Sequence, residues 1–228
     1  TLEPDLDLVA GNLGLNNKFH PSSEHPLVVY QSDFDGNKTN DIVLAKTGTD
    51  RELPVRGIQC SSLQMPFIKD KFHSFEAYAN ASLQDIYGQK GLAGARRLKA
   101  TTFASVLLVN DGGHFTATAL PMMAQLGPVR SAMFTDADSD GRPDLLIAGG
   151  IYGTEAETGR YDAGMGLLLT GDAAHKLVAQ PVLHSGFSVP HDTRHVLPIN
   201  LAKMGPAFVA LNNDGPVLVF ARRRTGTR

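Results

Sequence analysis

The stretch "FTDADSDGRPDLLIAGG", residues 134–150, places four aspartates directly before an apolar run. Carboxylates this close repel one another, so the arrangement D-x-D-x-D-G-x-x-D predicts a loop folded around a cation. Calcium accepts about six to eight oxygen ligands, which alternate carboxylates on a tight turn supply. The ninth position closes the loop, and the seventh position ligates through its backbone carbonyl. The predicted ligands are Asp136, Asp138, Asp140, Arg142 and Asp144.

The flanking sequence excludes an EF-hand. That loop needs a bidentate Glu at its twelfth position and a helix on each side. Counted from Asp136, the twelfth residue is Ile147, which belongs to the apolar run "DLLIAGG". Such a short run predicts a buried strand. The loop is therefore expected to connect two β-strands.

A second copy of this pattern precedes the first in the chain. The segment "VVYQSDFDGNKTNDIVL" (28–44) aligns with "SAMFTDADSDGRPDLLI" (131–147) without a gap. Asn replaces Asp at the fifth position of the earlier loop and still offers a side-chain oxygen. Because Lys38 stands where the later loop has Gly141, weaker binding is expected there. The predicted ligands of this loop are Asp33, Asp35, Asn37, Thr39 and Asp41.

Repeated strands and hairpins predict an all-β fold. A third copy, "RHVLPINLAKMGPAFVAL" (194–211), keeps two strands and lacks the acidic loop. Each copy is followed by a hairpin, at 105–120, 165–180 and 208–221, two of them with Asn-Asp-Gly turns that tolerate positive φ. Strand, loop, strand and hairpin make four antiparallel strands, which is one blade of a β-propeller. We expect residues 1–228 to form a single propeller domain or a segment of one.

The N-terminus resembles the second half of a further blade. In "DLDLVAGNLG" (5–14), either Asp7 or Asp5 takes the place of the loop-closing carboxylate. The chain is therefore expected to be a piece of a longer protein, or to close its ring with this strand, which would remove two sheet edges.

Residues 58–104 do not follow the blade pattern. Within them, apolar residues recur at steps of three and four, which predicts one amphipathic helix ended by Gly88. This periodic set consists of Ile68, Phe72, Phe75, Ala79, Leu83 and Ile86. We expect a helical insertion packed over one face of the propeller, or alternatively a lid.

Composition narrows the class of function. The formal net charge of −2 gives no basis for nucleic-acid binding, and no apolar run is long enough for membrane insertion. No G-x-S-x-G, nucleotide-binding P-loop or Cys/His pair points to catalysis. His191 and His195 in "HDTRH" would bind zinc together only on a helix, and Pro190 and the strand-like "RHVLPI" argue against one. The sequence thus predicts a protein that is not an enzyme.

The motifs resemble those of a known family. "DFDGNKTNDIVL", "ELPVRGIQCSSLQMPFIKDKF" and "DADSDGRPDLLIAGGIYGTEAETGRYDAG" are similar to FG-GAP/VCBS-repeat proteins, and more closely to the cartilage-acidic-protein-like proteins with ASPIC/UnbV-type regions. The resemblance covers most of the chain. It implies an integrin-α-like propeller of seven blades with calcium in its loops, and the same ten ligands in this sequence. Members of that family are secreted or lie at the cell surface.

The sequence supports three hypotheses of function. The first is a non-catalytic calcium-binding module for adhesion to a protein or glycan partner, located outside the cytoplasm, where calcium fills even weak loops. The second is the propeller part of a polysaccharide-acting, lyase-like enzyme. The third is a structural protein that associates with itself through exposed strand edges.

Overall fold

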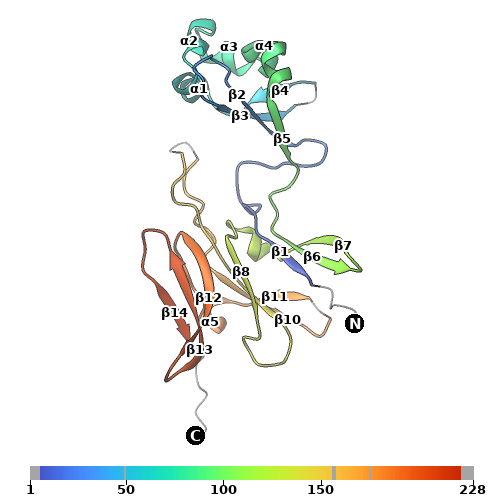
Figure 1. The fold of residues 1–228 in the computed structure, drawn as a ribbon, viewed down its shortest axis with the longest axis vertical. Coiled ribbons are helices and arrows are strands. Elements are labelled where there is room, and N and C mark those ends of the chain that lie inside the picture. Colours follow the sequence, from blue (N-terminus) through green and yellow to red (C-terminus); the bar gives the residue numbers. More distant parts are fainter. Residues whose placement is uncertain (1–5, 49, 156–157, 175, 222–228) are drawn as a thin grey trace. The chain divides into compact units, whose positions relative to one another are not determined.

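The computed structural model describes residues 6–48, 50–155, 158–174 and 176–221. It divides into two compact units. The discontinuous unit consists of Thr1–Lys18 and Phe103–Arg228, and the inserted unit is Phe19–Thr102. The described residues form four antiparallel sheets of three or four strands with short helices (Figure 1). The all-β prediction is thus confirmed in its coarser part, a mostly β fold.

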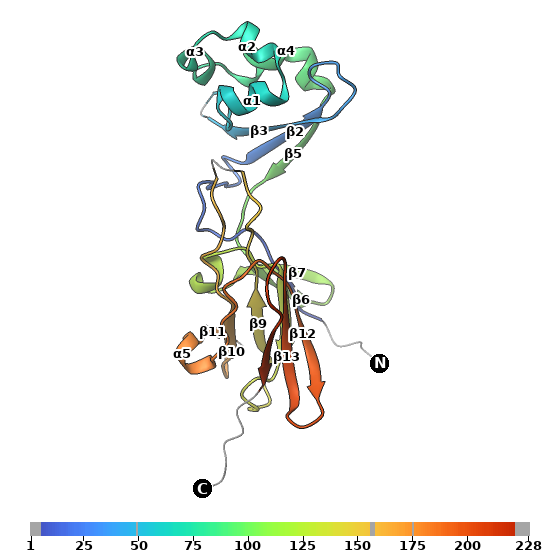
Figure 2. The ribbon, with the colours of Figure 1, turned by 90° about the vertical axis from the view of Figure 1, so that its left-hand side faces the viewer.

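The inserted unit is a four-stranded sheet covered on one face by helices (Figure 2). Alternate residues of the strands, such as Val28, Tyr30 and Val43, pack on Ile68 and Leu83 of the helices. The sheet has the order β4-β3-β2-β5. Its elements are β2 (Leu27–Ser32), β3 (Asp41–Thr47), β4 (Glu52–Pro54), α1 (Ile58–Gln64), α2 (Phe67–Lys71), α3 (Phe75–Ala79), α4 (Leu83–Gly94) and β5 (Arg96–Ala100).

The prediction of one long amphipathic helix is wrong. Five of the six periodic residues lie on α2, α3 and α4, and Phe72 directly follows α2. The run is divided because two serines each begin a new helix. Ser74 and Ser82 each accept a hydrogen bond from a backbone N–H of the following helix, at 3.1 Å, and Asp85 completes a capping box with Ser82. Gly88 breaks the helix as expected, with φ at 75°. The region is also not helical throughout, since β5 closes it.

The discontinuous unit contains three sheets. Their orders are β1-β6-β7, β11-β10-β9-β8 and β12-β13-β14. The elements are β1 (Leu8–Ala10), β6 (Val106–Asp111), β7 (His114–Ala119), the 3-10 helix η1 (Met122–Gln125), β8 (Ser131–Thr135), β9 (Asp144–Ala148), β10 (Leu167–Gly171), β11 (Leu177–Ala179), α5 (Val182–Ser185), β12 (Thr193–Leu201), β13 (Gly205–Asn212) and β14 (Leu218–Ala221).

All three hairpins expected from the sequence are present as antiparallel pairs: β6 with β7, β10 with β11, and β13 with β14. The sheet of β8 to β11 is the predicted four-stranded meander. The first hairpin, however, does not join the strands of the first acidic loop, since it pairs with β1. The strands on either side of the first acidic loop have other partners: β3 pairs with β4, and β2 pairs with β5. Both partners come before the hairpin in the sequence.

Strand β9 lies between the two apolar clusters of the discontinuous unit. Leu145 and Ile147 belong to the cluster shared with β1 and β6, while Leu146 and Ala148 belong to the cluster shared with β12 to β14. All five residues of β9 are buried. The apolar run behind the acidic loop is therefore a strand covered on both faces, as its sequence predicts.

The finer prediction of a ring is not reproduced. Among the described residues, each strand belongs to one of four small sheets, and no closed propeller is present. No helix in this part of the chain has the length and apolar character needed to span a bilayer.

Candidate metal centres

The acidic loop between β8 and β9 brings three of its carboxylates together. Oxygens of Asp136, Asp138 and Asp144 all lie within 4.8 Å of one another. Asp136 and Asp138 are exposed at the rim of the loop, and Asp144 is fully buried at its base. This spacing suits a single cation held by several carboxylate oxygens.

Backbone N–H groups fix these carboxylates in place. Asp136 accepts from Asp140 N at 3.1 Å and from Gly141 N at 3.2 Å, one bond to each of its oxygens. Asp138 Oδ1 also accepts from Asp140 N, at 3.1 Å. Asp144 Oδ2 accepts from Ala137 N at 2.7 Å. The loop is thereby folded back so that its side-chain oxygens converge.

The loop between β2 and β3 has the same network. Oxygens of Asp33, Asp35 and Asp41 lie within 4.8 Å of one another. Asn37 N donates to Asp33 and to Asp35, both at 3.1 Å, and Lys38 N donates to Asp33 at 2.9 Å. Asp41 Oδ2 accepts from Phe34 N at 3.0 Å. Each of these four bonds has its counterpart in the loop between β8 and β9, although the two loops lie in different units.

Both loops have positive φ at their fourth and sixth positions. The values are 78° for Gly36 and 70° for Lys38 in the first loop, and 64° for Ser139 and 83° for Gly141 in the second. In each loop only one of these two positions is a glycine, the fourth in the first loop and the sixth in the second. The other position therefore holds a non-glycine residue in the left-handed region. The Lys38 substitution that the sequence shows therefore leaves the loop conformation unchanged.

The ninth-position aspartates connect the loops to their sheets. The second oxygen of Asp144 accepts from Gly171 N of β10 at 2.9 Å. The second oxygen of Asp41 accepts from the side chain of Gln64, at the end of α1, at 3.1 Å. The side chain of Gln64 thus donates to the closing aspartate of the first loop, as the N–H of Gly171 donates to that of the second. Sequence reasoning missed Gln64, because no local pattern relates it to a loop more than twenty residues earlier.

The remaining predicted ligands lie at the same loops but outside the carboxylate clusters. Asn37 Oδ1 accepts from Thr39 N at 2.7 Å and is bonded to the Thr39 hydroxyl. Asp140 Oδ1 accepts from Arg142 N at 2.9 Å, and its Oδ2 forms an ion pair with the Arg142 guanidinium. Arg142 also reaches Gly171 O through Nε at 2.9 Å. The guanidinium thus neutralises one of the four carboxylates.

Hydrogen bonding lowers the pKa of Asp33. The N–H of Lys38 is the main cause, and those of Gly36 and Asn37 add to it, since all three favour the ionised carboxylate. Asp33 is therefore an anion at neutral pH, as a cation ligand must be. A group of carboxylates and amide oxygens without sulfur or imidazole is suited to a hard cation such as Ca²⁺. The residues present fit calcium.

A buried carboxylate elsewhere serves a structural role. Asp192 is 1% exposed, and its Oδ2 accepts from Arg194 at 3.0 Å and from Asn213 at 3.3 Å. Arg130 lies 3.9 Å from its other oxygen. The adjacent residues form β12 and not a helix, so the zinc pairing of His191 with His195 is not made on a helix face.

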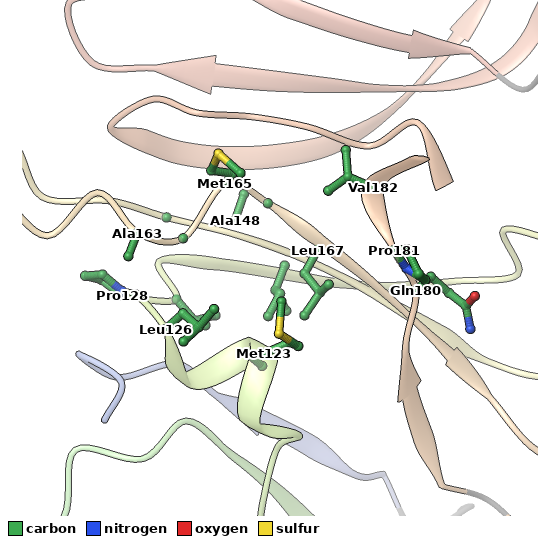
Figure 3. Close-up of a pocket in the computed structure, with 17 residues that line it drawn as sticks. Met123, Leu126, Pro128, Ala148, Ala163, Met165, Leu167, Gln180, Pro181 and Val182 are labelled. Atoms are coloured by element: carbon green, nitrogen blue, oxygen red, sulfur yellow. The ribbon is translucent and has the colours of Figure 1, made fainter. Parts of the chain in front are cut away.

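The discontinuous unit also contains an apolar pocket of about 140 Å³ (Figure 3). Met123 and Leu126 of the η1 region face Met165 and Leu167 across it. Among the described residues that line the pocket, Gln180 alone has a polar side chain, and its Nε2 donates to the Thr170 hydroxyl at 2.7 Å. These described lining residues include no acid, base or nucleophile.

Comparison with known protein families, with curated proteins and with solved structures finds no match to this chain. The two loops and the sheets that hold them are therefore the features of this chain that bear on its function.

Proposed function

We propose that this chain is a non-catalytic calcium-binding module that acts outside the cytoplasm and binds a protein or glycan partner. The observation that carries the proposal is the pair of equivalent loops. In each loop, carboxylate oxygens of three aspartates lie within 4.8 Å of one another and accept matching hydrogen bonds from backbone N–H groups. The two loops belong to different units of the chain. A network repeated in different surroundings indicates a common ligand.

The proposed role of the ion is structural. Each loop joins neighbouring strands of one sheet, so an ion there fixes the turn and offsets the repulsion between carboxylates. A ligand that binds only the folded state stabilises it by about 2.7 kcal/mol at a hundredfold excess over its Kd. Weak extracellular calcium sites have Kd values of about 10⁻⁴–10⁻³ M, which fits a location where calcium is abundant.

The sheets of the discontinuous unit are proposed to be propeller blades. The meander of β8 to β11 has the strand order of a blade, and β9 buries both faces against neighbouring sheets. This arrangement and the acidic loops agree with the resemblance to FG-GAP/VCBS-repeat proteins. In this proposal the rigid blades present their connecting loops to the partner.

The test is calcium titration of the purified chain by calorimetry, together with thermal melts in EDTA and in millimolar calcium. We expect two ions per chain, one for each cluster, and a melting temperature raised by several degrees. Asp35→Asn and Asp138→Asn preserve side-chain size and should each remove one ion. Each should also remove part of the thermal shift.

The matched control is Asp214→Asn. Asp214 is an exposed aspartate with φ at 48° in the turn between β13 and β14, where Asn is equally accommodated. This variant should bind two ions and keep the full thermal shift. A chain that binds no calcium and melts at the same temperature in EDTA would contradict the proposal.

A further inference from the structure

The sheet β1-β6-β7 repeats three strands of the sheet that holds the second acidic loop. In the smaller sheet β1 pairs with β6, and β6 pairs with β7; in the larger one β9 pairs with β10, and β10 with β11. Leu8 lies opposite Leu108 as Leu145 lies opposite Leu169. Strand β1 therefore occupies the place of β9, the strand that follows an acidic loop.

Asp7 takes the place of the loop-closing aspartate. Its Oδ1 accepts from Asn110 N at 2.9 Å, and Asp144 Oδ1 accepts from Gly171 N at the same distance. In both cases the donor lies on the neighbouring strand, two residues after the partner of the leucine that follows the aspartate. Asp5, the alternative candidate, lies outside the described residues.

Among the described residues, no strand takes the place of β8 beside β1. Within residues 6–48, 50–155, 158–174 and 176–221, β1 pairs with β6 alone. Leu8 is 48% exposed, whereas its equivalent Leu145 is fully buried. Asp7 is exposed, whereas Asp144 is fully buried and its Oδ2 accepts a hydrogen bond from Ala137 N of the loop. The unpaired edge of β1 and the exposed carboxylate of Asp7 could therefore accommodate a fourth strand followed by an acidic loop.

We propose that the free edge of β1 binds an extended polypeptide segment consisting of an alternating strand followed by a D-x-D-x-D-G loop. The strand pairs antiparallel to β1, as β8 pairs with β9. Asp7 supplies the closing carboxylate of a calcium site otherwise formed by the incoming loop. The binding of calcium at this site depends on the proposed function, whereas the pairing of the strand with β1 does not.

The acidic loop defines the occupant. Asp7 Oδ1 already has its donor in Asn110 N, and a plain strand would bring none to Oδ2. A loop of this kind offers the N–H that Asp144 Oδ2 receives from Ala137. Strand addition at an exposed edge gains main-chain hydrogen bonds, and the side chains provide specificity. A second copy of this chain does not have such a segment free, because its β8 is already paired with β9.

The first test uses the unmodified chain and a labelled peptide of residues 127–143, GPVRSAMFTDADSDGRP, which contains β8 and its loop. We expect saturable binding in millimolar calcium, measured by fluorescence anisotropy and weakened in EDTA. Asp7→Asn should weaken binding at least tenfold, and so should a peptide with Asn at its three loop aspartates. Asp111→Asn, on β6 of the same sheet, should bind like the parent chain.

A chimera keeps the test decisive if the free peptide binds weakly, because a tethered segment acts at a high effective concentration. Residues 1–6 are replaced by a copy of residues 127–143, so that proline precedes Asp7 as Pro143 precedes Asp144. We expect one more calcium ion than in the parent chain and slower amide exchange at Leu8–Ala10.

Two results together would overturn the inference: no saturable binding of the peptide, and a chimera with the parent's calcium count and unchanged exchange. Failure of the proposed function is a different result, since the parent chain itself would then bind no calcium. In that case slower exchange in the chimera in EDTA would still support pairing along β1, and unchanged exchange would still contradict it.

Discussion

Single residues with positive φ determine the shape of the acidic loops. Gly141 has a φ of 83°, and a Cβ placed on it would meet no atom within 4 Å. Gly141→Ala therefore incurs only the backbone cost of the left-handed region. We expect a loss of about 1 kcal/mol in the free energy of unfolding, measured by urea denaturation in EDTA.

Gly153→Ala is the control for that change. Gly153 is also exposed and open to a Cβ, but its φ is not positive. Alanine there should stabilise the chain by a few tenths to about 1 kcal/mol, because it restricts the unfolded state. Equal effects of the two variants would mean that the left-handed turn does not constrain the loop.

The loops also show which residue roles the sequence reveals. Spacing was sufficient to find Asp136, Asp138 and Asp144, because a short turn fixes their proximity. The cross-connections of Arg142 and Gln64 depend on neighbours brought in by the fold, namely Gly171 and Asp41. No local pattern encodes such partners.

At the scale of elements, β9 is expected to contribute most to the stability of its unit. Leu145 is fully buried, and it lies in the cluster shared with β1 and β6. Leu145→Ala should lower the free energy of unfolding by about 2–5 kcal/mol, through lost apolar contact and the cavity left behind. Chemical denaturation with saturating calcium measures this separately from ion binding.

Leu183→Ala in α5 is the matched control, because Leu183 is 96% exposed. It should change the free energy of unfolding by no more than about 0.5 kcal/mol. A similar loss in both variants would show that β9 is not the buried centre of the unit.

The hairpins and β9 could be predicted because their signals are local: glycine turns, alternation and an unbroken apolar run. The pairing of β2 with β5 could not, because it joins Leu27 to Ala100 across all the helices of the inserted unit. The helix was predicted too long since apolar periodicity continues through Ser74 and Ser82. The side chains of these two serines cap the starts of α3 and α4, and so they divide the periodic run into separate helices.

At the scale of the whole molecule, residues 19–102 have the properties of a domain inserted into another. Every member of their apolar cluster lies between Val28 and Ala95, and all four strands of their sheet come from the same segment. The pairing of Leu27 with Ala100 brings the entry and exit of the chain side by side. Such a segment can be inserted into a loop without separating the strands on either side of it.

A fragment of residues 19–102 is therefore expected to fold by itself. It should give a dispersed amide NMR spectrum and a single cooperative melt, and calcium should raise its melting temperature through Asp33, Asp35 and Asp41. A fragment of residues 19–72 is the control, because it lacks β5 and the helices that carry Tyr78, Leu83 and Ile86, and so it should remain unfolded. If residues 19–102 were also unfolded, the sheet would depend on contacts from outside its own segment, and the acidic loops would have to be regarded as parts of one cooperative structure. If the fragment folds and responds to calcium, the loop between β2 and β3 is a self-contained binding motif, and its match to the loop between β8 and β9 reflects a shared ligand and not a shared environment.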